Sequence, residues 1–171
     1  MTQRITPLTE DEKIEWFVLH LPYRQKMLTT YGLIYKDSSL YQQAIPKEII
    51  ENIEICCAEA SRIACRFFIE FMGLGTNKYG ELTEKTNYHK ESDGNSYEIK
   101  IIDLGGKWVT LNDLKADEKK LLERTNLTVH KATAHLTYKA PYGGEHEIIY
   151  DSVELINRLL KTHLYDIVNY K

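Results

Sequence analysis

Apolar residues recur at three- and four-residue intervals along most of the chain, a period that predicts amphipathic helices. The first such stretch begins after Thr9, whose hydroxyl can cap a helix, and three acidic residues follow it at the positive end of the helix dipole. Pro22 interrupts this stretch; because proline has no N–H to donate, it should either kink the helix or begin a second one. The helical spacing ends near Lys36, and residues 37–39 predict a loop.

The clearest helix in the sequence runs from Pro46 to Met72, where Gly73 is placed to end it. Its apolar residues fall within a sector of about 140°, and a sector that wide predicts burial against several neighbouring elements. The residues of this predicted buried sector are Ile49, Ile53, Cys56, Ala60, Ile63, Ala64, Phe67, Phe68 and Phe71. Charged side chains at 59, 62, 66 and 70 flank the sector at spacings that predict ion pairs along the helix surface.

The long connection after this helix divides into two parts. Residues 74–96 are polar, contain several glycines and show no period, which predicts an exposed loop. From 97 to 111, apolar residues alternate with charged ones around Gly105 and Gly106, a pattern typical of a small β-hairpin.

Two further helices complete the pattern. Asn112 or Asp113 is placed to cap a helix over 114–138, and Asp151 or Ser152 to cap a final helix. β-Branched residues leave one alternative open, in which 128–138 and 147–150 pair as strands around the turn at 141–144. The sequence therefore predicts a mainly α fold: an up-and-down bundle of four to five helices, with a small β-hairpin in the connection before the fourth long helix.

Composition is that of an ordinary globular protein. The 171 residues are 43% hydrophobic and 27% charged, which predicts a single domain over 1–171 with a core of its own. No apolar run approaches the ~20 residues that cross a bilayer, and the polar start of the chain is unlike a signal peptide. We therefore expect a cytoplasmic protein with no membrane partner.

The three cysteines all fall within the helix predicted over 46–72, where Cys56 and Cys57 are adjacent and cannot readily form a disulfide with each other. We expect Cys56, Cys57 and Cys65 to be free thiols in the core or at its edge. The sequence contains neither a metal-binding cysteine and histidine spacing nor a phosphate-binding glycine motif, so neither a metal nor a cofactor is expected.

Charge is distributed unevenly along the chain. Residues 107–139 contain seven Lys or Arg and four Asp or Glu, a net charge of +3, whereas the whole chain has a net charge of −3. Two of the six histidines, His130 and His135, lie in this basic region. On a helix, Arg124, Lys131 and His135 would share one stripe, and His130 would project from a different side. A broad nucleic-acid surface is excluded by the net charge, but a small basic site is not.

Arg124-x5-His130 and the string His-Lys-Ala-Thr-Ala-His-Leu-Thr over 130–137 resemble the motif-bearing late helix of HEPN-domain proteins, many of which are ribonucleases of toxin or phage-defence systems. Two alignments are open. In one, His130 is the family's histidine and follows Arg124; in the other it is His135, and Lys131 stands closest to the arginine.

The resemblance implies a homodimeric helical bundle in which Arg124, His130, Lys131 and His135 are candidate catalytic residues for metal-independent RNA cleavage. That chemistry uses the 2′-OH as nucleophile, a histidine with a pKa near neutrality as acid or base, and a cation to offset phosphorane charge. The resemblance also implies an alternative, a non-catalytic dimerisation or partner-binding module, because many members of the superfamily lack the catalytic residues. A cognate antitoxin or another protein is then the expected partner.

Overall fold

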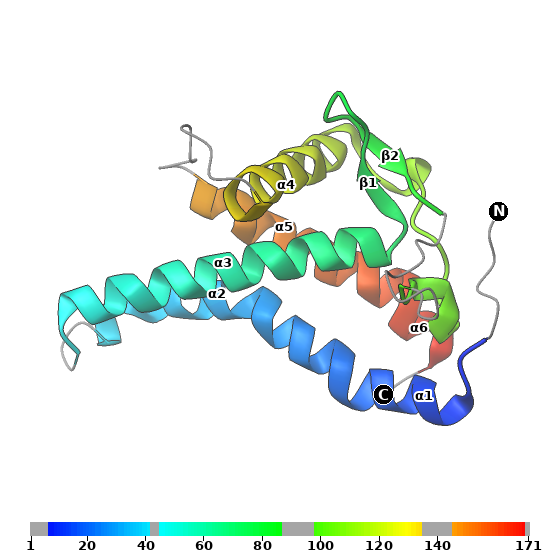
Figure 1. The fold of residues 1–171 in the computed structure, drawn as a ribbon, viewed down its shortest axis with the longest axis horizontal. Coiled ribbons are helices and arrows are strands. Elements are labelled where there is room, and N and C mark those ends of the chain that lie inside the picture. Colours follow the sequence, from blue (N-terminus) through cyan, green and yellow to red (C-terminus); the bar gives the residue numbers. More distant parts are fainter. Residues whose placement is uncertain (1–6, 42–44, 87–97, 135–144, 170–171) are drawn as a thin grey trace.

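A computed structural model describes residues 7–41, 45–86, 98–134 and 145–169, with their side chains except at 35–41, 130–134 and 145–147. The described residues form a mainly α bundle with one two-stranded antiparallel hairpin, as the sequence predicts (Figure 1). Its elements are the helices α1 (Glu10–Glu15), α2 (Leu21–Tyr41), α3 (Lys47–Phe71), α4 (Ala116–Ala134), α5 (Glu145–Leu160) and α6 (Asp166–Val168), and the strands β1 (Leu74–Thr76) and β2 (Leu82–Glu84).

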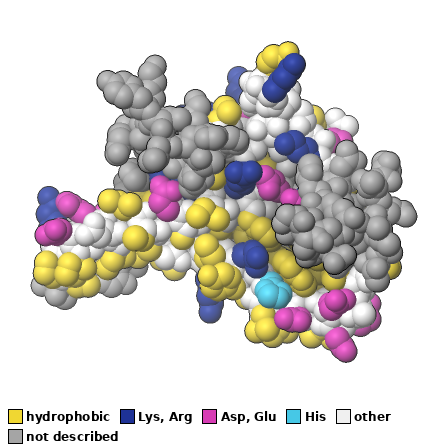
Figure 2. Space-filling model, in the orientation of Figure 1, with side chains coloured by type: hydrophobic (Ala, Val, Ile, Leu, Met, Phe, Trp, Pro, Cys, Tyr) yellow, Lys and Arg dark blue, Asp and Glu magenta, His cyan; other side chains and the backbone are white. Residues whose placement is uncertain are grey.

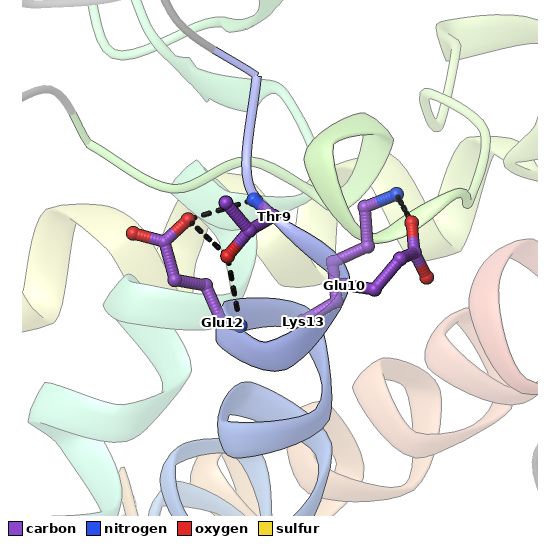
Figure 3. Close-up of polar contacts among 4 residues, drawn as sticks. All are labelled: Thr9, Glu10, Glu12 and Lys13. Carbon is purple, nitrogen blue, oxygen red and sulfur yellow. Dashed lines mark hydrogen bonds and ion pairs between the residues drawn. The ribbon is translucent and has the colours of Figure 1, made fainter.

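The first helix begins as its sequence predicts. The Thr9 hydroxyl accepts a hydrogen bond from the backbone N–H of Glu12 at 3.3 Å, and the Glu12 carboxylate accepts one from the N–H of Thr9 at 2.7 Å (Figure 3). This reciprocal arrangement satisfies two N–H groups that a helix start leaves without partners. Between α1 and α2, residues Trp16–His20 form a π-helical turn, so the chain passes Pro22 without breaking the helical path.

Helices α2 and α3 lie side by side, and together they form an arm that extends away from the rest of the molecule (Figure 1). The buried Ser61 hydroxyl links them. It donates a hydrogen bond to the carbonyl oxygen of Met27 at 2.9 Å and accepts one from the N–H of Tyr31 at 3.3 Å.

The core lies where the C-terminal half of α3 meets α4, α5 and the start of α2. Phe68, Ile69 and Leu122 are fully buried there, together with Leu21 and Ile156. Between α4 and α5, the Thr125 and Ser152 hydroxyls are hydrogen-bonded to each other within the core. Burial of these large side chains provides most of the free energy that holds the helices together.

The end of α3 is tightly built. Gly73 has a φ of +85°, and a Cβ atom there would lie 2.3 Å from the Trp108 ring, so only glycine fits. The buried Lys100 donates a hydrogen bond from Nζ to the carbonyl oxygen of Glu70 at 3.1 Å and pairs with Glu98 at 2.7 Å. A cation at this carbonyl offsets the negative end of the helix dipole.

The hairpin is in the predicted connection but at different residues. Over 98–111, two 3-10 turns (Ile101–Leu104 and Leu111–Asp113) replace the strands predicted for 97–111. Gly105, at φ +86°, ends the first turn, and the N–H of Lys107 then bonds to the carbonyl oxygen of His163 rather than to a partner strand. The observed hairpin lies in the predicted loop 74–96, where the buried Leu74 and Leu82 fix it to the body; residues 87–96 lie outside the described part.

Three helix boundaries also differ from the sequence prediction. Residues 37–39 continue α2 instead of forming a loop. Helix α5 begins at Glu145, so Asp151 and Ser152 are interior residues, and Ser152 bonds to the carbonyl oxygen of Ile148. The Asp113 carboxylate accepts hydrogen bonds from the backbone N–H and the hydroxyl of Thr110 in the 3-10 turn before α4, instead of capping α4. Residues 128–134 and 145–150 are helical, which excludes the alternative strand pairing over that part of the chain; 135–144 lie outside the described residues.

The predicted buried sector of α3 is wrong from Ile49 to Ile63, where several of its residues are exposed. Ala64, Phe68 and Phe71 are buried as expected, but Ile49 and Ile63 are about half exposed, at 49% and 50%. The core instead contacts the face that carries Ile50, Ala58, Ser61, Cys65 and Phe68. Cys65 is buried, which raises the pKa of its thiol to about 12, whereas Cys56 is exposed; all three cysteines are free. The predicted ion pairs Glu59–Arg62 and Arg66–Glu70 are present on the same helix.

Within the described ranges, no helix is both long enough and apolar enough to span a bilayer.

Candidate functional site

Helix α4 carries the predicted site residues, and its buried face is well defined. Leu122, Thr125, Asn126 and Val129 point into the body, where their side chains are at most 7% exposed. Arg124 lies on the opposite face and is exposed to solvent. The exposed Lys120 lies one turn before it on the same face.

The structure brings only part of the predicted set together. Helix α4 is continuous to Ala134, so positions 124 and 131, seven residues apart, lie on the same face. Position 130 is six residues from Arg124, about 120° around the helix. The side chains of His130 and Lys131, and all of His135, lie outside the described residues, so both alignments of the histidine stay predictions.

Asn126, two residues after Arg124, has a structural role. Its side chain is buried, and Nδ2 donates a hydrogen bond to the Thr76 hydroxyl at 3.2 Å. The bond fixes α4 to strand β1. Asn126 is therefore not available to contact a ligand.

The β-hairpin packs directly beside this stretch of α4 (Figure 1). The N–H of Leu82 donates a hydrogen bond to the Glu123 carboxylate at 3.0 Å. At the hairpin turn, a Cβ atom on Gly80 would lie 3.2 Å from the Leu127 side chain. Glu123 and Leu127 flank Arg124 on the side of α4 that faces the hairpin. The hairpin turn therefore adjoins the cationic face of α4, which Lys120 and Arg124 form.

An aromatic side chain stands at the tip of this hairpin. Tyr79 is 75% exposed, the most exposed of the large hydrophobic residues described, and Lys78 Nζ lies 4.9 Å from the centre of its ring. Asn77 holds the turn, because its Oδ1 accepts hydrogen bonds from the N–H groups of Tyr79 and Glu81. The polar sequence of 74–96 predicts a loop and so does not single out Lys78 and Tyr79; Asn77 and Gly80, three residues apart, are the signal for a tight turn.

Among the described residues, no three His, Cys, Asp or Glu side chains are grouped so that they could hold a metal ion. His20 lies against Trp16, with ring centres 4.8 Å apart, and 3.5 Å from the Glu15 carboxylate. The two histidines whose side chains the structure describes, His20 and His163, both lie outside α4.

Comparisons with family models, with curated proteins and with solved structures each found no significant match to the chain.

Proposed function

We propose that the face formed by α4 and the β-hairpin binds single-stranded RNA, and that a histidine near the end of α4 cleaves the bound strand without a metal ion. The observation that supports this proposal is the exposed Tyr79, held at the hairpin tip beside the cationic face of α4. The HEPN resemblance of the α4 sequence points to the same helix.

The two components of this face suit the two parts of a nucleotide. An exposed aromatic ring stacks on an unpaired base at about 1–3 kcal/mol per base, with little dependence on sequence. Lys78, Lys120 and Arg124 supply positive charge for the phosphates, and each phosphate contact releases counterions and adds to the salt dependence of binding. A site with three cationic side chains does not require a basic protein, so it is compatible with the net charge of −3.

The proposed cleavage is a transfer within the RNA itself. The 2′-oxygen forms a bond to the adjacent phosphorus while the bond to the 5′-oxygen breaks, leaving a 2′,3′-cyclic phosphate and a 5′-hydroxyl. His130 or His135 would accept the 2′-hydroxyl proton or donate one to the leaving oxygen. Arg124 or Lys131 would offset the charge that develops on the phosphorane.

Binding is tested first, by fluorescence anisotropy with a labelled single-stranded RNA of about 12 nucleotides over a range of salt concentrations. Tyr79→Ala should weaken binding about tenfold, while Tyr79→Phe, which keeps the ring, should stay within about twofold of wild type. Arg124→Ala should weaken binding and lower its salt dependence. Lys107→Ala is the matched control, because it removes the same charge from an exposed site away from α4. Equal affinity of all four variants would contradict the proposed RNA face.

Cleavage is tested with the same RNA in excess chelator, comparing wild type with His130→Ala and His135→Ala and using His20→Ala as the control histidine. Loss of cyclic-phosphate products in only one of the variants His130→Ala and His135→Ala would decide between the two alignments. RNA that is bound but stays intact with the wild type would contradict the catalytic part and favour the alternative, a non-catalytic binding module. Absence of both binding and cleavage would leave the partner-binding alternative, with a protein as the ligand.

A further inference from the structure

Helix α3 presents a second apolar face to solvent, about 120° around the helix from the face that contacts the core. Apolar side chains occur on it at spacings of four, three, four, three and four residues, which is the pattern of a coiled-coil seam. The residues of this α3 seam are Ile49, Ile53, Cys56, Ala60, Ile63 and Phe67. Figure 2 shows hydrophobic side chains gathered along the arm that α2 and α3 form.

Most of the seam is open to solvent, and its body end, Phe67, packs against the core. Ile49, Ile53 and Ile63 are 49%, 38% and 50% exposed, Cys56 is exposed, and Ala60 and Phe67 are half-buried. Phe67, at the body end, is partly covered by the Arg24 guanidinium, whose carbon lies 4.5 Å from the ring centre. A regular seven-residue repeat fits another helix better than it fits an irregular surface, because each side chain enters a hole between side chains of the facing helix.

We infer that this seam docks on the same seam of a second copy of the chain, with the two α3 helices antiparallel and a two-fold axis passing near residue 58. In that register each of the six seam residues faces another: Ile49 faces the partner's Phe67, Ile53 faces the partner's Ile63, and Cys56 faces the partner's Ala60. The seam is therefore complementary to itself, which a two-fold interface requires. The smallest side chains meet at the axis and the larger ones at the ends, as suits two helices that cross.

Charge along the seam permits this pairing. The positions on the side of the seam away from the core are Asn52, Glu59 and Arg66. Glu59, nearest the axis, is already paired with Arg62 of its own chain, and Arg66 with Glu70 at 2.9 Å, so the two copies bring no unpaired like charges together. The positions on the other side, Ile50, Cys57 and Ala64, carry no charge at all.

The size of the interface sets its strength. Eighteen residue steps separate Ile49 from Phe67, so the seam is about 27 Å long and one helix wide. Because the contact is only one helix wide, we expect a weak, reversible dimer that forms between about 5 and 500 µM protein. This inference rests on α3 alone and is independent of RNA binding on α4.

Sedimentation equilibrium of the full chain between 5 and 500 µM tests the inference with three variants. Wild type should dimerise, Ile53→Lys should weaken dimerisation at least tenfold, and Ile55→Lys should stay within about twofold of wild type. Ile55 is the matched control because it is the same residue type on the same helix, 61% exposed but off the seam. The third variant, Ile53→Lys with Ile63→Glu in one chain, should recover dimerisation, since the antiparallel register places each lysine opposite the partner's glutamate.

Three outcomes would overturn the inference. A monomer at every wild-type concentration would exclude self-association and leave the seam to a helix of another protein. Equal dimerisation of wild type and Ile53→Lys would place the interface elsewhere. Failure of the double variant to recover, with its folded helical content confirmed by circular dichroism, would contradict the antiparallel register, because a parallel pair would face lysine with lysine. If Ile53→Lys does not fold, Ile63→Lys takes its place.

Discussion

The two halves of α3 are both rich in apolar residues but have different surroundings. In the C-terminal half, Phe68 and Ile69 are fully buried against α4, α5 and α2. In the N-terminal half, Ile49 and Ile55 are 49% and 61% exposed on the arm that α3 forms with α2, which α5 joins at Ala58. One apolar helix thus has two roles: the body half holds the fold together, and the arm half presents apolar area that a lone chain leaves in water.

Truncation of a large side chain in each half should give the largest contrast. Phe68→Ala should lower the free energy of unfolding by about 4 kcal/mol, because it removes a fully buried ring and leaves a cavity. Ile55→Ala should change it by less than about 0.5 kcal/mol. Urea titration at low protein concentration measures both, and equal effects would show that the arm belongs to the same packed core.

A backbone change at the body end of α3 should come next in size. Gly73→Ala should cost about 3 kcal/mol, since the φ of +85° is strained for alanine and its Cβ would overlap the Trp108 ring. The double variant with Trp108→Ala separates the two causes in the same titration. If it recovers none of the loss, the overlap with the ring is not the reason.

Removing the cation at the end of α3 should have a smaller effect. Lys100→Met keeps most of the buried side chain but loses the hydrogen bond to Glu70 and the ion pair with Glu98. We expect a loss of about 1–2 kcal/mol in thermal unfolding at neutral pH. Lys47→Met, at the exposed start of the arm, should leave the midpoint unchanged within error.

The smallest effect concerns pH. Hydrogen bonds from Thr110, first from its backbone N–H, hold the pKa of Asp113 below its ordinary value of 3.8. Because the folded-state pKa is the lower one, this carboxylate stabilises the fold above the ordinary value, and the contribution disappears as the pH falls through the folded-state pKa. Asp113→Asn should therefore be less stable than wild type at pH 7, by less than about 1 kcal/mol, and equal to it in strong acid. A difference that persists at pH 2 would contradict this origin.

The sequence predicted the parts of the fold that local chemistry determines. The cap at Thr9, the start of α3 at Pro46 and its end at Gly73 all follow from side chains within one helical turn, and all three are confirmed. The hairpin was placed wrongly because Gly105 fits a β-turn equally well, and only the distant carbonyl oxygen of His163 determines that the chain turns elsewhere.

The seam on α3 and the tip of the hairpin were missed for a related reason. A period of three and four residues shows that a face is apolar, but not whether another element covers it, so Ile49 and Ile63 were assigned to the core. For the α4 site, Arg124 is exposed as a ligand-binding residue must be, whereas Asn126 proved to be a buried contact with β1. Tyr79 lies at the hairpin tip because β1 pairs with β2, and the sequence alone does not specify that pairing.

The most direct test of the division between body and arm is urea unfolding of wild type and Ile53→Lys, each at 5 and 500 µM protein. If the seam stabilises only a dimer, the two proteins have the same midpoint at 5 µM, and only the wild-type midpoint rises at 500 µM, by about 0.5 M urea. A wild-type midpoint that does not change with concentration, or a lower midpoint for Ile53→Lys already at 5 µM, would contradict the account.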